Sequence, residues 1–185
     1  PFMLENVLID EYAAIEPASI IKKRGVHYGS SISHSKSTDS PSTIWTGIVA
    51  RKLDLHLTNL GFGGNCILEP MIAKMIRDMK ADMITLKLGI NCHSGSLTKR
   101  SFEPNAIGLI SIIREKHPET PLAVISPIIS PEREDTRFFE NSLTLKEMRE
   151  ILRIVVNKFK KYGDKNISYV DGLEILGADK LEYLP

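Results

Sequence analysis

The sequence has few cysteines, almost no net charge and no long apolar run, and each shortage excludes a class of protein. Two cysteines, Cys66 and Cys92, occur among 185 residues, so the chain has no disulfide framework. Lys and Arg number 24 and Asp and Glu 23, giving a net charge of +1. That balance is not the clustered basic excess of a nucleic-acid-binding protein. No segment approaches the roughly 18 consecutive apolar residues of a membrane span.

Motifs for metal binding and for secretion are also missing. Neither Cys-x-x-Cys nor His-x-x-x-His occurs, so we expect no metal site and two free, partly buried thiols. No charged segment followed by an apolar one opens the chain, so no signal peptide is evident and a cytoplasmic location is expected. The chain starts at Pro1 rather than Met, so an upstream piece could have been lost.

What remains is the composition of an ordinary soluble domain. Hydrophobic residues make up 42% and charged residues 25% of the chain, and 185 residues suffice for one full core. Residues 1–23 are difficult to place, although Leu4, Val7, Leu8 and Ile9 could form a strand. We interpret 1–23 as a leader or the remnant of a preceding module, and 24–185 as the main domain.

From Arg24 onward, apolar runs of strand length alternate with segments of helical periodicity. The predicted strands are 26–28, 55–60, 83–88, 121–126 and 167–170. The run at 121–126 is almost continuously apolar, as expected of a strand buried on both faces. The predicted helices are 41–53, 71–79, 102–113 and 145–159. This alternation predicts a three-layer α/β/α sandwich around a five-stranded parallel sheet.

Several residues mark where these helices begin, end and face the core. Ser40-Pro41 reads as an N-cap followed by proline at the first helical position. Thr144 and Glu147 form a capping box, and Gly163 is a plausible stop. The stripe that runs from Met71 to Met79 predicts core packing.

Three polar loops follow the first three predicted strands. They read Gly29-Ser30-Ser31, Gly63-Gly64-Asn65 and Gly89-Ile90-Asn91. Parallel strands end at the same sheet edge, and ligands bind there, so we expect the loops to form one site. A serine hydroxyl, a bare glycine backbone and a carboxamide are the groups needed for nucleophilic attack and oxyanion binding.

Each loop alone also has an ordinary structural interpretation. The serines can be simple loop hydroxyls, the glycines a tight turn, and Asn91 a turn residue. The serine loop is not the Gly-x-Ser-x-Gly elbow, because position 33 is serine.

Taken together, the three loops resemble the sequence blocks of the SGNH hydrolases, also called GDSL-type esterases and lipases. The resemblance covers roughly residues 24–185 and implies a flavodoxin-like topology. It places the nucleophile at Ser31 and the oxyanion donors at Gly64 and Asn91. Ser30 and Cys92 stand where the family has aspartates. The substrate-binding positions that we expect around these residues are Ser30, His34, Gly63, Cys92 and His93.

The fourth block of this family, Asp-x-x-His, supplies the general base, and no histidine of this sequence has that spacing. The chain as given is therefore expected to lack its catalytic His and Asp. His34 and His93 lie close enough in sequence to the predicted site to be considered as substitutes; the alternative is that both only line the pocket.

Three functions fit this pattern. The leading prediction is a serine ester hydrolase or acyltransferase that acts on a small-molecule ester without metal or organic cofactor. A non-catalytic relative could instead bind an acylated sugar or similar ligand in the same pocket. A flavodoxin-like nucleotide binder has the right architecture but would need a phosphate-binding loop that the sequence does not show.

Overall fold

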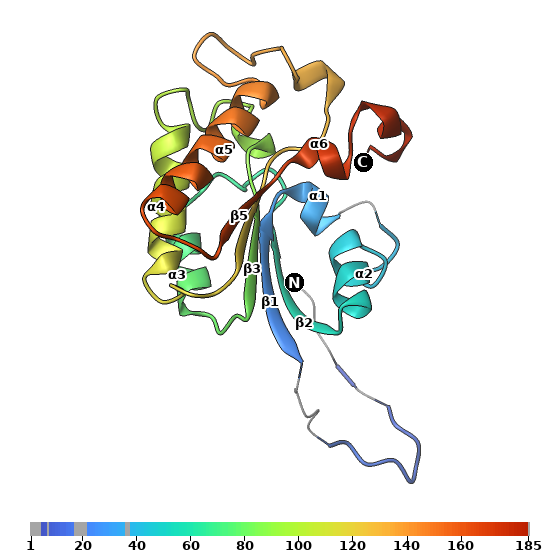
Figure 1. Ribbon diagram of the computed structural model, residues 1–185. Helices are drawn as coiled ribbons and strands as arrows, with labels where there is room; N and C mark the ends of the chain where they lie inside the picture. The colour runs from blue at the N-terminus through green and yellow to red at the C-terminus, as the bar shows by residue number, and fades with distance from the viewer. Residues whose placement is uncertain (1–4, 7, 17–21, 36–37, 185) are drawn as a thin grey trace.

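Five parallel strands form the centre of the protein. The computed structural model describes residues 5–6, 8–16, 22–35 and 38–184. The strands are β1 (Lys23–Gly29), β2 (Leu55–Gly61), β3 (Met83–Lys87), β4 (Leu122–Ile125) and β5 (Ile167–Val170). They lie in the order β2-β1-β3-β4-β5, and every neighbouring pair is parallel (Figure 1). The predicted five-stranded parallel sheet is confirmed.

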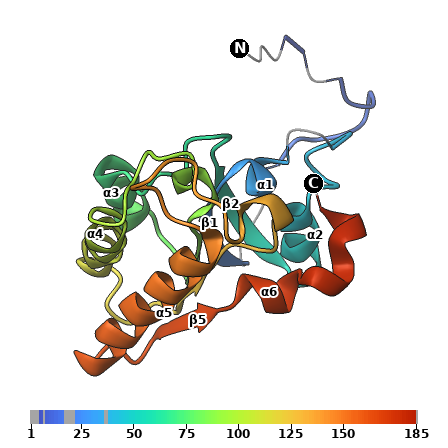
Figure 2. The ribbon, with the colours of Figure 1, turned by 90° about the horizontal axis from the view of Figure 1, so that it is seen from above.

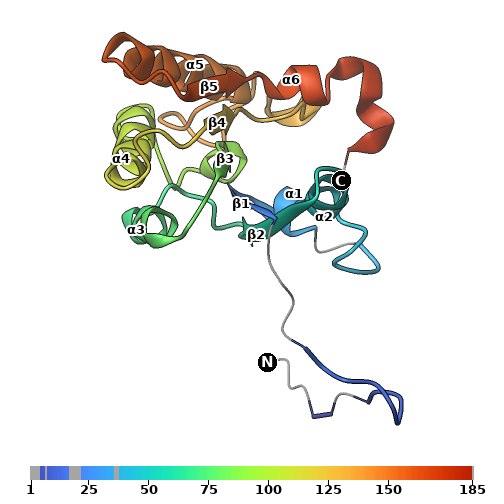
Figure 3. The ribbon, with the colours of Figure 1, turned by 60° about the horizontal axis from the view of Figure 1, so that its bottom comes forward.

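Helices cover both faces of this sheet. The helices are α1 (Ser31–His34), α2 (Trp45–Lys52), α3 (Pro70–Asp78), α4 (Phe102–Arg114), α5 (Leu145–Lys161) and α6 (Gly172–Ile175). Short 3-10 segments are η1 (Ile90–Cys92), η2 (Pro131–Arg133) and η3 (Ala178–Tyr183). Figure 3 shows α3 and α4 on one side of the sheet and α1 and α2 on the other. The three-layer prediction is therefore also confirmed.

The main core lies between the sheet and the long helices α3, α4 and α5. Leu86 and Val124 on the strands and Ile110 and Leu152 on the helices are completely buried. Burying such a side chain stabilises the fold by roughly 1.5–3 kcal/mol. The capping box of Thr144 is present at the start of α5, as predicted.

Two predicted features of the helices are wrong. Helix α2, which precedes β2 in the chain, begins at Trp45 rather than at Pro41. The Ser40 hydroxyl accepts the Ser42 N–H (3.1 Å), and the Ser40 carbonyl accepts the Thr43 N–H (3.1 Å). These bonds form a separate turn, so Ser40 caps no helix. Met71 is 70% exposed, because the buried face of α3 runs through Ala73 and Ile76 instead.

Strand β4 is buried on one face more than on the other. Leu122 and Val124 are buried, whereas Ala123 and Ile125 are only half-buried. Ile125 shares a hollow of about 230 Å³ with Trp45 and Val49 of α2. The expectation of burial on both faces is therefore wrong, because the short helices α1 and α2 pack mainly against β1 and β2.

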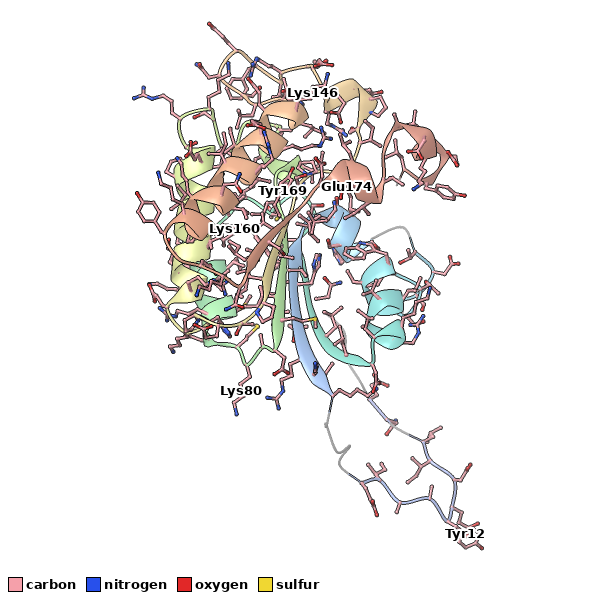
Figure 4. The ribbon with its side chains drawn as sticks, viewed as in Figure 1. Tyr12, Lys80, Lys146, Lys160, Tyr169 and Glu174 are labelled. Atoms are coloured by element: carbon pink, nitrogen blue, oxygen red, sulfur yellow. The ribbon has the colours of Figure 1, made fainter. Side chains whose placement is uncertain are left out.

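Residues 8–16 lie apart from the sheet (Figure 1). Residues 8–16 contain no helix or strand, and Leu8 is 93% exposed. Tyr12 stands far from the body of the domain (Figure 4). The possible strand at Leu8 and Ile9 is thus not formed, while Leu4 and Val7 lie outside the described residues. The division at residue 23 stays a prediction.

None of the helices in the described part of the chain combines the length and the apolar character needed to cross a membrane.

Candidate active site

The three polar loops meet where the strand order reverses. The sheet order places β1 beside β3, and the chain leaves β1 toward α1 on one face but leaves β2 toward α3 on the other (Figure 3). Such a reversal opens a crevice at the carboxyl ends of the strands. Figure 2 looks down on this edge, with α1 over the ends of β1 and β2.

Ser31 is the first residue of α1 and is exposed to solvent. Ser30 caps this helix: its side-chain oxygen accepts the Ile32 N–H at 3.3 Å. The sequence Gly29-Ser30-Ser31 thus ends a strand, caps a helix and leaves the next hydroxyl at the surface. This is the position that a serine nucleophile requires.

Three side chains from other elements hold α1 in place. A 2.7 Å hydrogen bond joins His27 Nε2 to Ser33 Oγ. The Asn59 side-chain amide donates to the Ser33 carbonyl (2.8 Å), and Trp45 Nε1 donates to the Ile32 carbonyl (2.9 Å). A single helical turn would not be stable alone, so these bonds fix the position of Ser31.

His27 is a structural histidine rather than a base for Ser31. Its other ring nitrogen, Nδ1, bonds Thr85 Oγ1 at 2.7 Å, so both nitrogens are occupied. Burial, together with the nearby Lys87 ammonium, lowers the pKa of His27 to about 4. The ring is therefore neutral at pH 7, with one nitrogen donating and the other accepting.

Two glycines of the second loop allow it to approach α1. A Cβ added at Gly61 would lie 2.7 Å from the Ser33 carbonyl carbon, so a side chain there would collide with the helix backbone. Gly64 has φ +74°, which an L side chain adopts only with strain. A Cβ on the neighbouring Gly63 would lie 3.9 Å from Ser31 Cβ. The loop backbone is thus next to the serine.

The Asn91 amide is oriented by the backbone. Its Oδ1 accepts the Cys66 N–H at 3.1 Å, which leaves the NH₂ group as the end available to a ligand. Asn91 lies in η1, directly after β3, and is partly exposed. An amide held in this way is a preorganised donor.

A cavity of about 680 Å³ joins the predicted catalytic groups. Ser31, Gly64 and Asn91 all line it, as does His93. The rest of the wall comes from Ile32, Ser35, Thr38, Ile90, Ser94 and Arg133. Residues 31, 64 and 91 are up to 60 positions apart in the sequence. In the structure they lie around one surface cavity, where the sequence analysis expected the three loops to meet.

The other predicted binding residues are distributed differently. Ser30 and Cys92 are both 0% exposed and do not reach this cavity. His34 is exposed and lines a neighbouring hollow between α1 and α2. Gly63 lies beside Ser31 and His34 without lining the cavity itself. No hydrogen bond joins either His34 or His93 to Ser31 Oγ in the described residues, and His93 Nε2 instead donates to the Thr136 carbonyl (2.9 Å).

Both cysteines are free thiols, as predicted, but they are fully rather than partly buried. Burial raises the pKa of the Cys66 thiol to about 12 and also raises that of Cys92. Neither forms the reactive thiolate at neutral pH. In residues 22–35 and 38–184, no three His, Cys, Asp or Glu side chains lie close enough to hold a metal ion.

Sequence reasoning missed the residues that support the site. His27, Trp45 and Asn59 hold α1, and Arg133 of η2 forms part of the cavity wall. The one available signal was Asn59, which stands two residues before Gly61, just ahead of the second polar loop.

A serine at the head of a helix, a glycine loop and an oriented asparagine, on a five-stranded parallel sandwich, define the SGNH class of hydrolases. The profile of the GDSL-like lipase/acylhydrolase family matches residues 22–183. The chain belongs to this family.

Solved structures agree with this assignment. The salicylyl-acyltransferase SsfX3 from a tetracycline biosynthetic pathway is 34% identical, with a TM-score of 0.83 over 92% of this chain and 49% of its own. A putative GDSL-like lipase from Bacteroides ovatus is 25% identical, with a TM-score of 0.71 over 85% of this chain and 45% of its own. The chain thus spans about half the length of these two proteins.

A more distant structure shares the fold alone. AlinE4, an SGNH-hydrolase family esterase, is 14% identical, with a TM-score of 0.63 over 89% of this chain and 83% of its own. No curated protein sequence matches the chain.

Proposed function

We propose that this domain transfers acyl groups through Ser31, as an ester hydrolase or an acyltransferase. The observation that carries the proposal is the convergence of Ser31, Gly64 and Asn91 on one cavity. Membership of the GDSL-like lipase/acylhydrolase family supports this reaction class. The likeness to a salicylyl-acyltransferase supports an acceptor other than water as well as hydrolysis.

In this mechanism the Ser31 hydroxyl attacks the acyl carbonyl carbon. The Ser31 N–H, the Gly64 N–H and the Asn91 NH₂ group donate to the oxyanion that forms. Collapse of the intermediate releases the alcohol and leaves an acyl-serine. Water or a second alcohol then attacks the acyl-serine and regenerates the hydroxyl.

The reaction needs a base that accepts the Ser31 proton, because a neutral hydroxyl is a poor nucleophile. His27 is neutral but occupied on both nitrogens, and neither His34 nor His93 is hydrogen-bonded to Ser31 in the described part of the chain. We therefore propose that the base is a histidine that makes no hydrogen bond to Ser31 in the described residues. For this reason, activity is tested in the full gene product.

The experiment compares the full gene product with its Ser31→Ala variant on short acyl esters of 4-nitrophenol. We expect turnover by the parent and none above background by the variant. Ser33→Ala would be a poor control because Ser33 holds His27; Ser111→Ala is a better one, because Ser111 is exposed on α4 and does not line the cavity. Unchanged turnover in Ser31→Ala would refute the serine mechanism.

A second candidate function is ligand binding without cleavage. The observation that favours it is the missing hydrogen bond between Ser31 and any described histidine. The two functions separate in the same assay, since a binding module would bind the ester and release it intact. Acyl-serine formation, read as a mass increase on a Ser31 peptide, would exclude the binding module.

A further inference from the structure

Lys87 carries a buried ammonium group. It ends β3 and is 5% exposed, and its Nζ has no hydrogen-bond partner among the described residues. Thr85, two residues earlier, bonds His27 Nδ1, so the strand alternation puts Lys87 on the same face, toward α1. An unpaired buried charge costs several kcal/mol, and a protein rarely retains one without use.

Lys87 lines a second cavity, of about 110 Å³. Its polar wall residues are Lys87, Ser130 and Arg133. Ile32, Ile90 and Arg133 line both this cavity and the larger one that contains Ser31. The smaller cavity is therefore a side chamber of the candidate active site, and its volume is well above the roughly 10–15 Å³ that one water molecule needs.

The groups around the chamber leave its positive charge uncompensated. Burial lowers the pKa of Lys87 to about 8, which still leaves the ammonium mostly protonated at pH 7. His27 and the Cys66 thiol, the neighbours that interact with it, are neutral. Arg133 adds a second positive charge.

The Glu134 carboxylate, next to Arg133 in the sequence, is already engaged. Glu134 accepts two hydrogen bonds from the Arg149 guanidinium and one from the Ser130 N–H. Its charge is therefore balanced outside the chamber. The Glu69 carboxylate accepts the Tyr28 hydroxyl at 2.7 Å.

We propose that this side chamber is a subsite for a carboxylate carried by the substrate, with Lys87 and Arg133 as its charge partners and Ser130 as a hydrogen-bond donor. The substrate class is then an ester with a second, anionic end, such as a half-ester of a dicarboxylic acid. The identity of the ligand as a substrate rests on the proposed function, whereas the carboxylate preference of the chamber does not.

The test measures binding, not turnover. Monomethyl succinate and dimethyl succinate are titrated calorimetrically into the full gene product and its Lys87→Met variant. We expect the parent to bind the charged half-ester at least about 10-fold more tightly, since a hydrogen bond to a charged group contributes roughly 1.5–3 kcal/mol. Lys87→Met should lose most of this preference, because only Arg133 and Ser130 then remain to bind the carboxylate.

Two further readouts separate this role from a structural one. Lys87→Met should raise the melting temperature of the free protein, because an apolar side chain of similar volume replaces an unpaired charge. The preference for the half-ester should also fall above pH 8, as the Lys87 ammonium loses its proton. Lys80→Met is the control, because Lys80 is exposed at the opposite end of the sheet (Figure 4); it should keep the preference.

Equal affinity for both esters in the parent, or an unchanged preference in Lys87→Met, would overturn the subsite. A carboxylate preference without ester turnover would retain the subsite and refute only the catalytic proposal. Ester turnover without a carboxylate preference would support the catalytic proposal and refute the subsite.

Discussion

At the scale of single residues, the two ends of the Asn91 amide have different roles: one end is held by the backbone and the other is the candidate oxyanion donor. Its oxygen accepts the Cys66 N–H, which leaves the NH₂ group to donate to a ligand in the cavity that Asn91 lines with Ser31. The two ends can be tested separately, because aspartate keeps the acceptor and loses the donors.

Asn91→Ala should lower kcat about 100-fold to 1000-fold, as expected when one oxyanion donor is removed. Asn91→Asp should lower kcat at least as much but leave the melting temperature nearly unchanged, since the bond to the Cys66 N–H persists. Ester turnover and thermal unfolding of the full gene product measure both effects. A fully active Asn91→Asp would show that the amide is not an oxyanion donor.

His27 gives a pH prediction. Its pKa is about 4 in the fold, against an ordinary value of 6.5, so the unfolded chain binds more protons between these two values. Stability should therefore fall as the pH drops from 6.5 to 4, by about 3 kcal/mol in all. Denaturant titrations across this range provide the measurement.

In His27→Gln this part of the acid dependence should disappear, although the variant is less stable throughout. His56 is exposed on β2, so His56→Gln should retain the parent's pH dependence. The same slope in His27→Gln and the parent would contradict the assignment.

At the scale of elements, the position of α1 depends on close contact with the end of β2. The backbone of Gly61 lies against residues 33 and 34 of α1, so an added methyl group must push the helix away. That displacement would also move Ser31, which begins the same helix.

Gly61→Ala should destabilise the fold by about 1–3 kcal/mol and lower ester turnover. Gly108→Ala is the matched control, because a Cβ there meets nothing within 4 Å and lies in α4. Alanine in that helix should stabilise the protein by roughly 0.5–1 kcal/mol. Urea unfolding of both variants distinguishes the two cases; an equally stable Gly61→Ala would show that α1 tolerates the shift.

Elements were predictable where a single physical pattern determined them. Apolar periodicity marked all five strands, and the hydroxyl of Thr144 marked the start of α5. The predicted helix start at Ser40 was wrong because a serine followed by proline suits both a helix start and a separate turn. The predicted burial of Met71 was wrong because helical spacing does not show which edge of the apolar stripe faces solvent.

At the scale of the whole molecule, one buried ion pair ties the loop after β4 to α5. Arg149 is bound to both Glu134 carboxylate oxygens, at 2.6 and 2.8 Å, and donates to the Pro127 and Ile128 carbonyls. Burial opposes ionisation of Glu134, but the Arg149 bonds prevail and hold its pKa below the usual value.

Arg149→Met should cost about 3–5 kcal/mol, because it leaves the Glu134 charge buried and unpaired. Adding Glu134→Leu should recover most of that loss. The exposed pair of Arg153 and Glu150 is the control, and Arg153→Met should change stability little. Chemical denaturation of the four proteins gives the comparison; a double variant no better than the single one would contradict the argument.

The assembly of the site was predictable because parallel strands deliver their loops to one edge. The sequence did not reveal Lys87 or Arg133 as neighbours of that edge. Lys87 is the last residue of a mostly apolar strand, where nothing in the sequence marks it as facing the site. Arg133 lies in a loop whose path follows from the ion pair of Arg149 rather than from any local pattern.

Because the loop at 127–142 carries two residues of the proposed carboxylate subsite and none of the candidate reacting groups, ester selectivity and reactivity can be varied independently. The candidate reacting groups leave the ends of β1, β2 and β3, whereas Ser130 and Arg133 come from a different connection. Libraries randomised in that connection, with Glu134 retained, should yield altered ester selectivity while Ser31, Gly64 and Asn91 keep their positions.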